Sequence, residues 1–152
     1  MDHFEGTASG HISAPPHKVF ALITDIDRLP EWNSCIRAVV EKPASLTPGG
    51  EWLVKIRVPG LPPWTSRSRV EEYDAERLRF TYRSRSDDGN PSYIVWTWAL
   101  RPDEGGGTVA TVGWKGSPKT FWRRVIFSHI RKRQLENEVT ESIASLERVV
   151  GA

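Results

Sequence analysis

The feature that most constrains the fold is a run of six strand-like segments between Ile36 and Trp114. Clusters of turn residues divide this run at Pro48–Gly50, Pro59–Pro63, Tyr73–Glu76, Ser86–Pro91 and Pro102–Gly107. Connections of this length join antiparallel neighbours, because a parallel pair needs a crossover of about a dozen residues or more. The run therefore predicts an antiparallel meander of six strands.

Two neighbouring segments of the run show the alternation of a sheet that has one buried face. The apolar phase consists of Leu78, Phe80 and Tyr82 in the first segment and of Ile94, Trp96, Trp98 and Leu100 in the second. Successive side chains of a strand point to opposite faces, so all members of one phase share a face. We therefore expect one face of the sheet to cover a core.

Short elements precede the six segments. Residues 4–13 predict a further strand, and the Pro15-Pro16 pair starts a short helix over His17–Ile23. A second short helix fits Arg28–Asn33. With the meander, the first strand gives a sheet of seven.

A long helix is predicted to follow the sheet. Ser117 fits the N-cap and Pro118 the first helical position, and no breaker follows before Gly151, which gives about thirty residues. The apolar residues recur at the helical period, at Phe121, Val125, Leu135, Val139, Ile143, Leu146 and Val150. We therefore expect an α+β fold in which this helix covers one face of the sheet.

The composition fits a single globular domain over residues 1–152. Lys and Arg number 21 against 19 Asp and Glu, and the net charge of +2 gives no general attraction to nucleic acid. No apolar run approaches the ~20 residues of a transmembrane helix, and the first residues lack the regions of a secretory signal. The single cysteine, Cys35, suits a reducing compartment. We therefore expect a cytoplasmic protein.

Three segments of the chain resemble a known family. His11–Asp25 is similar to the opening strand and short helix of the START-like (SRPBCC) superfamily, which includes polyketide cyclase/dehydrase and lipid-transport-like proteins. Leu29–Asn33 is similar to its P-x-W turn, and Trp98–Pro102 with Gly107–Thr111 to its paired last strands. The resemblance implies the helix-grip fold, a curved antiparallel seven-stranded sheet wrapped around a long C-terminal helix, with two short helices after the first strand. It also implies an apolar cavity between sheet and helix.

The inward apolar positions are candidates for the wall of such a cavity. Large aromatic side chains suit planar rings or acyl chains, although they also fill ordinary cores. We expect the mouth at Asp25–Trp32 and at the Pro59–Trp64 loop. The expected ligand-binding residues are Trp32, Trp52, Val54, Ile56, Val70, Phe80, Tyr82, Trp96, Trp98, Ala110, Val112, Trp114, Phe121 and Val125.

Few polar residues share the inward phase, and two of them are candidates for acid-base catalysis. Tyr82 could donate a proton, or simply bond a backbone carbonyl, and His129 could act as a base near neutral pH, or lie on the helix surface. Glu71 and Glu72 are adjacent in a strand, so we expect them to face opposite sides and form no carboxylate pair. The other polar candidates of this phase are Ser66, Ser68, Glu72 and Ser84, and Glu72 could act alone inside or reach solvent at the strand end.

The sequence predicts neither a metal site nor a cofactor. The histidines are scattered without the spacing of metal ligands, at His3, His11, His17 and His129. Cys35 has no motif-based partner for nucleophilic catalysis.

Basic residues gather in two places. Those of the polar phase predict a solvated outer face of the sheet and are Lys55, Arg57, Arg67, Arg69, Arg79, Arg83 and Arg85. Five basic residues also flank an apolar set within Arg123–Arg133, a pattern that can dock on anionic lipid headgroups. Peripheral membrane contact through Arg123–Arg133 is therefore one hypothesis, beside an ordinary solvated helix face.

Three functions fit these observations. The first is binding of a small hydrophobic molecule, such as a lipid, polyketide or aromatic compound, between the sheet and the C-terminal helix. The second is an aromatase/cyclase-type enzyme that acts on a polyketide, and the third is a protein-binding module of the chaperone-activator kind. The resemblance does not choose among them, because one fold hosts many functions.

Overall fold

The computed structural model describes residues 4–120, 123 and 132–151. Its strands are β1 (Phe4–Ile12), β2 (Ile36–Glu41), β3 (Glu51–Ile56), β4 (Trp64–Asp74), β5 (Arg79–Ser86), β6 (Tyr93–Pro102) and β7 (Thr108–Ser117). Its helices are α1 (Pro16–Ile23), the short 3₁₀ helix η1 (Ile26–Arg28), α2 (Leu29–Trp32) and α4 (Lys132–Val150).

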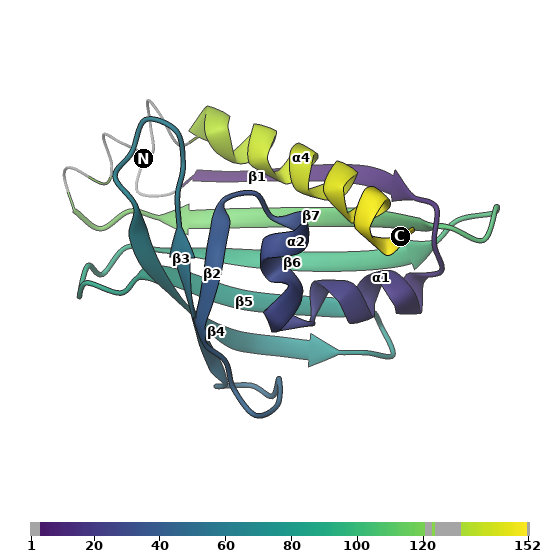
Figure 1. Cartoon of the computed structure of the whole chain (residues 1–152), viewed down its shortest axis with the longest axis horizontal. Helices are drawn as coiled ribbons and strands as arrows, with labels where there is room; N and C mark the ends of the chain where they lie inside the picture. Colours follow the sequence, from purple (N-terminus) through teal and green to yellow (C-terminus); the bar gives the residue numbers. More distant parts are fainter. Residues whose placement is uncertain (1–3, 121–122, 124–131, 152) are drawn as a thin grey trace.

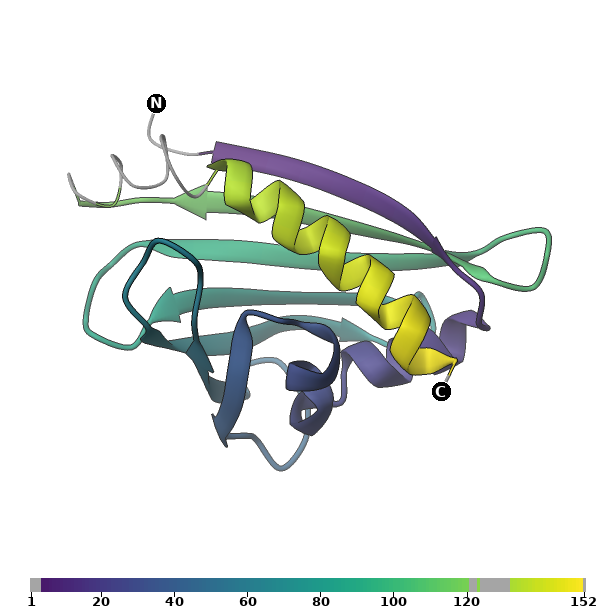
Figure 2. The same cartoon turned by 45° about the horizontal axis from the view of Figure 1, so that its top comes forward.

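The strands form one antiparallel sheet in the order β1-β7-β6-β5-β4-β3-β2. This order confirms the predicted meander from β2 to β7, and it shows that β1 closes the sheet beside β7 (Figure 1). The helix α4 lies along the sheet, while α1 and α2 contact α4 and complete the layer over the same face (Figure 2). The arrangement is the expected α+β helix-grip fold.

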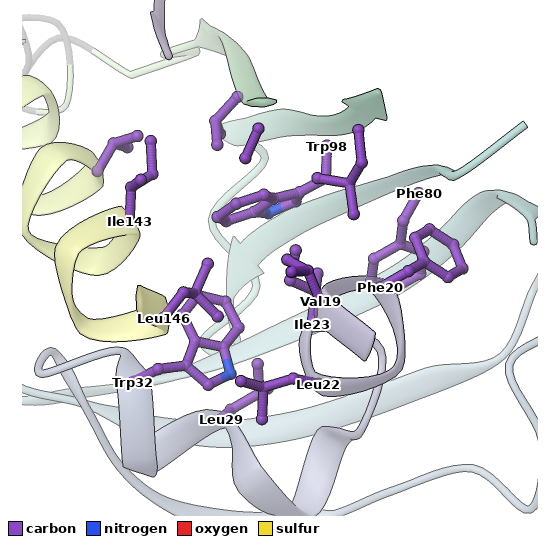
Figure 3. Close-up of a cluster of buried hydrophobic side chains, with 14 of the residues drawn as sticks. Val19, Phe20, Leu22, Ile23, Leu29, Trp32, Phe80, Trp98, Ile143 and Leu146 are labelled. Carbon is purple, nitrogen blue, oxygen red and sulfur yellow. The ribbon is translucent and has the colours of Figure 1, made fainter. Parts of the chain in front are cut away.

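The apolar stripe of α4 explains its place in the fold. Leu135, Val139, Ile143 and Leu146 are all buried, as the helical spacing predicted, and they pack with the short helices and the sheet in one core (Figure 3). The opposite side of α4 carries exposed polar residues such as Thr140. In the part of the chain that the structure describes, no helix has both the length and the apolar character of a membrane span.

One prediction about the start of the C-terminal helix is wrong. Ser117 is not an N-cap, because it ends β7, where its backbone pairs with Tyr93 of β6, and Pro118 is not helical. The ladder between β6 and β7 continues to this point, and its hydrogen bonds compete successfully with a local capping signal. The predicted helical residues at 121, 122 and 124–131 lie outside the described residues.

A β-bulge in β4 corrects the expectation for the two adjacent glutamates. Val70 pairs with Tyr82 and Glu72 with Thr81, so Glu71 is the extra residue of the bulge. Both carboxylates consequently lie on the exposed outer face, where Glu71 pairs with Arg83 and Glu72 with Arg79. They share a face, contrary to prediction, and that face is the one opposite the core.

Candidate functional site

A cavity of about 370 Å³ lies between the sheet, the short helices and α4. This volume falls within the range of roughly 300–1,000 Å³ that is typical of small-molecule sites. The cavity brings together most of the side chains predicted to contact a ligand, namely Trp32, Trp52, Val54, Ile56, Phe80, Tyr82, Trp96, Trp98 and Val112.

Three residues that were predicted to contact a ligand lie in the core and are not part of the cavity wall. Val70 and Ala110 are fully covered by neighbouring elements. The indole of Trp114 lies over Gly6 of β1, where a Cβ atom would come within 2.4 Å of the ring, so this ring fills the space at the β1 edge. Phe121 and Val125, the remaining two, lie outside the described residues.

Sequence reasoning missed one side of the wall, which the short helices supply. Ile23, Ile26 and Leu29 line the cavity together with the predicted Trp32. These four residues recur at intervals of three, so their spacing was a signal that this segment keeps one face inward. Ile26, Leu29 and Trp32 belong to the predicted mouth segment Asp25–Trp32. The second predicted mouth segment, the Pro59–Trp64 loop, lines the cavity through Leu61–Trp64.

The aromatic residues of the wall form a packed set. The rings of Trp32 and Trp98 meet edge to face with centroids 5.5 Å apart, and Trp52 lies 5.0 Å from Tyr82 and 5.9 Å from Phe80. Such contacts fix ring orientation and add stability beyond simple burial. The wall is therefore a rigid aromatic surface that suits flat or chain-like apolar molecules.

Tyr82 contributes a hydroxyl group to this aromatic surface. Burial raises its pKa to about 12, against a smaller lowering by the hydrogen bond with Trp98. The indole N–H of Trp98 donates to the phenolic oxygen, since an indole nitrogen has no acceptor capacity. The Tyr82 side chain is partly exposed because it lines the cavity. Its hydroxyl, in contrast, is surrounded by protein. The phenol is thus neutral at physiological pH and able to donate a hydrogen bond.

A second polar feature is a patch of four serines on two adjacent strands. Ser66 pairs with Ser86 and Ser68 with Ser84 across the β4–β5 ladder, and all four line the cavity. The hydroxyls of Ser68 and Ser84 are 2.7 Å apart and hydrogen-bonded. The inward phase of the sequence predicted three of these residues and missed Ser86. The patch makes one region of the cavity polar.

Arg123 lies against the serine patch and lines the cavity. Its Nη2 atom donates to Ser86 Oγ at 3.0 Å and reaches Asp88 Oδ2 at 3.4 Å. The backbone N–H of Asn90 and the Ser86 hydroxyl hold the pKa of Asp88 below its ordinary value, and the Arg123 charge adds to this effect. The guanidinium is therefore held at the polar end of the cavity beside an ionised carboxylate.

The indole N–H of Trp32 is buried without an acceptor among the described residues. Leaving such a donor unsatisfied costs about 1–3 kcal/mol. An acceptor that reached this nitrogen would therefore stabilise the complex that contained it.

The titratable residues suggested for other chemistry are dispersed. Among the described residues, no group of three or more His, Cys, Asp or Glu side chains has the arrangement of a metal site. His11 pairs with Asp103 at the β6–β7 hairpin, and His17 is exposed on α1. His3 and His129, the latter a predicted catalytic candidate, lie outside the described residues.

Several solved structures are similar to this chain over 97% of its length and 97% of theirs. They are the protein TTHA0849 from Thermus thermophilus (TM-score 0.74, 19% identity), protein CV1439 from Chromobacterium violaceum (0.76, 21%) and Ara h 8.0201 (0.69, 14%). At these identities the likeness shows a shared fold. No curated protein matches the chain significantly.

A family match agrees with the fold and with the apolar cavity. The profile described as polyketide cyclase/dehydrase and lipid transport covers residues 3–151, which is nearly the whole chain. The chain therefore belongs to the polyketide cyclase/dehydrase and lipid transport family.

Proposed function

We propose that this protein binds a small hydrophobic molecule, such as a lipid, a polyketide or an aromatic compound, in the cavity between the sheet and α4. The observation that carries the proposal is the cavity of about 370 Å³ with an aromatic wall. Transfer of apolar surface from water into such a wall contributes about 25 cal/mol per Å². The family, whose description includes lipid transport, supports the same function.

Tryptophan emission provides a direct test. Trp52, Trp96 and Trp98 line the cavity, so a bound apolar molecule is expected to change their fluorescence. We expect a saturable change on titration with the neutral probe N-phenyl-1-naphthylamine, and competition by lipids or flat aromatic compounds. A response that stays linear in probe concentration, or no response, would contradict the proposal and favour a protein-binding module.

A pair of matched substitutions locates the response. Ser84→Leu adds an apolar side chain inside the cavity, whereas Ser9→Leu makes the same change on the exposed outer face of β1. We expect Ser84→Leu to weaken probe binding at least tenfold while the protein stays folded, and Ser9→Leu to have no effect. Equal weakening by both variants would place the probe elsewhere.

Tyr82 supports a second function, an aromatase/cyclase-type enzyme that acts on a polyketide. Tyr82 lines the cavity and its hydroxyl is neutral and oriented by Trp98, so it could donate a hydrogen bond or proton to a ligand carbonyl as a ring closes. His129 is a further candidate for proton transfer from the sequence alone.

The enzymatic function has its own test. General acid-base groups contribute about 10²–10⁴-fold to rates, so Tyr82→Phe or His129→Ala is expected to lower turnover of a poly-ketone substrate by that factor while affinity is unchanged. Unchanged turnover in both variants would exclude acid-base roles for Tyr82 and His129, and no turnover by the wild type would favour a binding protein for that class of molecule.

We also propose that the segment Arg123–Arg133 contacts anionic membranes. Sedimentation with vesicles that contain phosphatidylserine is expected to decrease when the basic residues of this segment are replaced by glutamine. Unchanged sedimentation would exclude a contribution from this segment. A cytoplasmic location likewise stays a prediction of the sequence.

A further inference from the structure

We propose that the ligand of this cavity is amphipathic and carries a carboxylate, which Arg123 receives at the polar end while the apolar body lies against the tryptophans. This inference rests on the proposed binding function and narrows it to one chemical class. It follows from the two chemically different ends of the cavity.

Four separate segments meet at the polar end. β4 and β5 supply the serine patch, Ser92 of the β5–β6 loop accepts a hydrogen bond from the Lys119 backbone, and Arg123 donates to Ser86. At the other end, Trp32 and Trp98 meet edge to face beside Ile23 and Phe80. A molecule that fills the cavity therefore meets a cluster of hydrogen-bonding groups at one end and mainly aromatic and aliphatic side chains along its body.

The charges around the polar end favour an anion. Tyr93 also lines the cavity there, and its ring is covered by Arg83 at 4.1 Å and approached by Lys119 at 5.9 Å. Arg85 lies on the same strand as Ser84 and is among the lining residues, as is Glu138 of α4. Three carboxylates offset these cations. Glu71 pairs with Arg83 and Asp87 with Arg67 on the outer face, and Asp88 contacts Arg123.

Asp88 leaves Arg123 with capacity for a second carboxylate. A guanidinium has five N–H donors, and both contacts of Arg123 described above use the single nitrogen Nη2. The Asp88 carboxylate is more exposed than Arg123 (56% against 28% of the side chain), and Ser86 and the Asn90 backbone also donate to it. Water therefore screens Asp88, while Arg123 can form the paired hydrogen bonds that carboxylates favour.

A matched set of ligands tests the head group. Decanoate, decan-1-ol and methyl decanoate share a chain, but only decanoate is charged. A cavity without a cation would disfavour decanoate, because removing a carboxylate from water is costly. We expect the opposite order, with decanoate displacing N-phenyl-1-naphthylamine at about tenfold lower concentration than either neutral ligand.

Arg123→Gln keeps a polar side chain and removes the charge, so it is expected to weaken decanoate about tenfold and to leave decan-1-ol within twofold. Arg77→Gln, at the exposed β4–β5 turn, is the control and is expected to change neither. If wild type binds all three ligands alike, or Arg123→Gln does not affect decanoate, the carboxylate inference is overturned while the proposed binding function stands. If no ligand displaces the probe, both are overturned. The wild-type comparison decides the question even if the variant does not fold.

Discussion

The two ends of the space between the sheet and α4 are built differently. Toward the C-terminus of α4 the space is filled, and Leu146, Ile143 and Val19 are almost fully buried among neighbouring side chains (Figure 3). Toward the start of β4 and the end of β5 it opens into the cavity, where serines stand at the inward positions. The same sheet and the same helix therefore produce a core at one end and a binding site at the other.

Side-chain size at paired inward positions accounts for the difference. Along the β4–β5 ladder the inward pairs change from Ser66 with Ser86 and Ser68 with Ser84 to Val70 with Tyr82. At the filled end Gly10 of β1 lets α4 approach the sheet, since a Cβ atom there would lie 2.5 Å from Ile143 Cγ2. The cavity thus lies where the inward residues of the sheet are small and the helix does not fill the space in front of them.

The largest effect is expected from a deletion at the filled end. Leu146 is fully buried on α4, so Leu146→Ala should lower the free energy of unfolding by about 2–5 kcal/mol, as expected when a buried leucine leaves a cavity. Chemical denaturation measures this change. Thr140→Ala, on the exposed side of the same helix, is the control and should change stability by less than about 0.5 kcal/mol. Similar small values for both would show that α4 does not pack as described.

The next effect depends on pH and concerns Tyr82, which lies where the two ends meet. Its folded-state pKa of about 12 exceeds the ordinary value of 10.0, so the folded protein retains this proton more strongly than the unfolded chain. The contribution of the Tyr82 proton to the free energy of unfolding is therefore fully present below about pH 10 and is lost as pH rises toward 12. This loss is about 2–3 kcal/mol at most. Tyr82→Phe should remove this part of the alkaline loss in denaturation curves measured from pH 8 upward.

Tyr93 provides an internal contrast in the same titration. The pKa of Tyr93 is lowered from the ordinary value, mainly by the hydrogen bond with Ser117 and also by the charges of Arg83 and nearby lysines. Burial acts in the opposite direction, with a smaller effect than that hydrogen bond. Ultraviolet absorbance of the folded protein should thus show tyrosinate at Tyr93 before Tyr82. A reversed order, identified with Tyr82→Phe and Tyr93→Phe, would mean that the aromatic wall is hydrated.

The sequence predicted the fold well because its main signals are local and repeated. Alternating strands, turn clusters and the stripe on α4 each occur several times, so no single residue decides the outcome. The bulge at Glu71 and the extension of β7 to Ser117 were missed, because both depend on pairing with another strand. Local patterns do not contain that information.

The candidate site was harder to predict for a related reason. Phase along a strand indicates which residues point inward, and it correctly gathered Trp52, Phe80 and Trp98. Phase does not indicate whether other side chains fill the space in front of a residue, which is why Ala110 and Val70 were among the predicted ligand-binding residues. Arg123 was interpreted as part of a basic segment, since its contact with Ser86 joins residues 37 positions apart.

A smaller effect is expected from two glycine substitutions that differ in available space. Gly10→Ala would press a methyl group against Ile143, whose β-branched side chain cannot easily turn away, and should cost about 1–3 kcal/mol. Gly113→Ala in β7 meets nothing within 4 Å and should be neutral or stabilising by up to about 1 kcal/mol. Thermal unfolding of both variants measures the difference. Equal costs would contradict the close approach of α4 to β1.

The smallest effect is expected from filling at the open end. Ser66 lines the cavity, so Ser66→Val places two methyl groups into existing space, and valine is also favoured in strands. Small-to-large changes in a packed core typically cost about 1–3 kcal/mol, whereas here we expect a change within about 0.5 kcal/mol. Denaturation of the ligand-free protein is the required measurement, since a bound molecule would add its own stabilisation. A cost above about 1 kcal/mol would mean that this region is already packed, and the contrast between the two ends would then disappear.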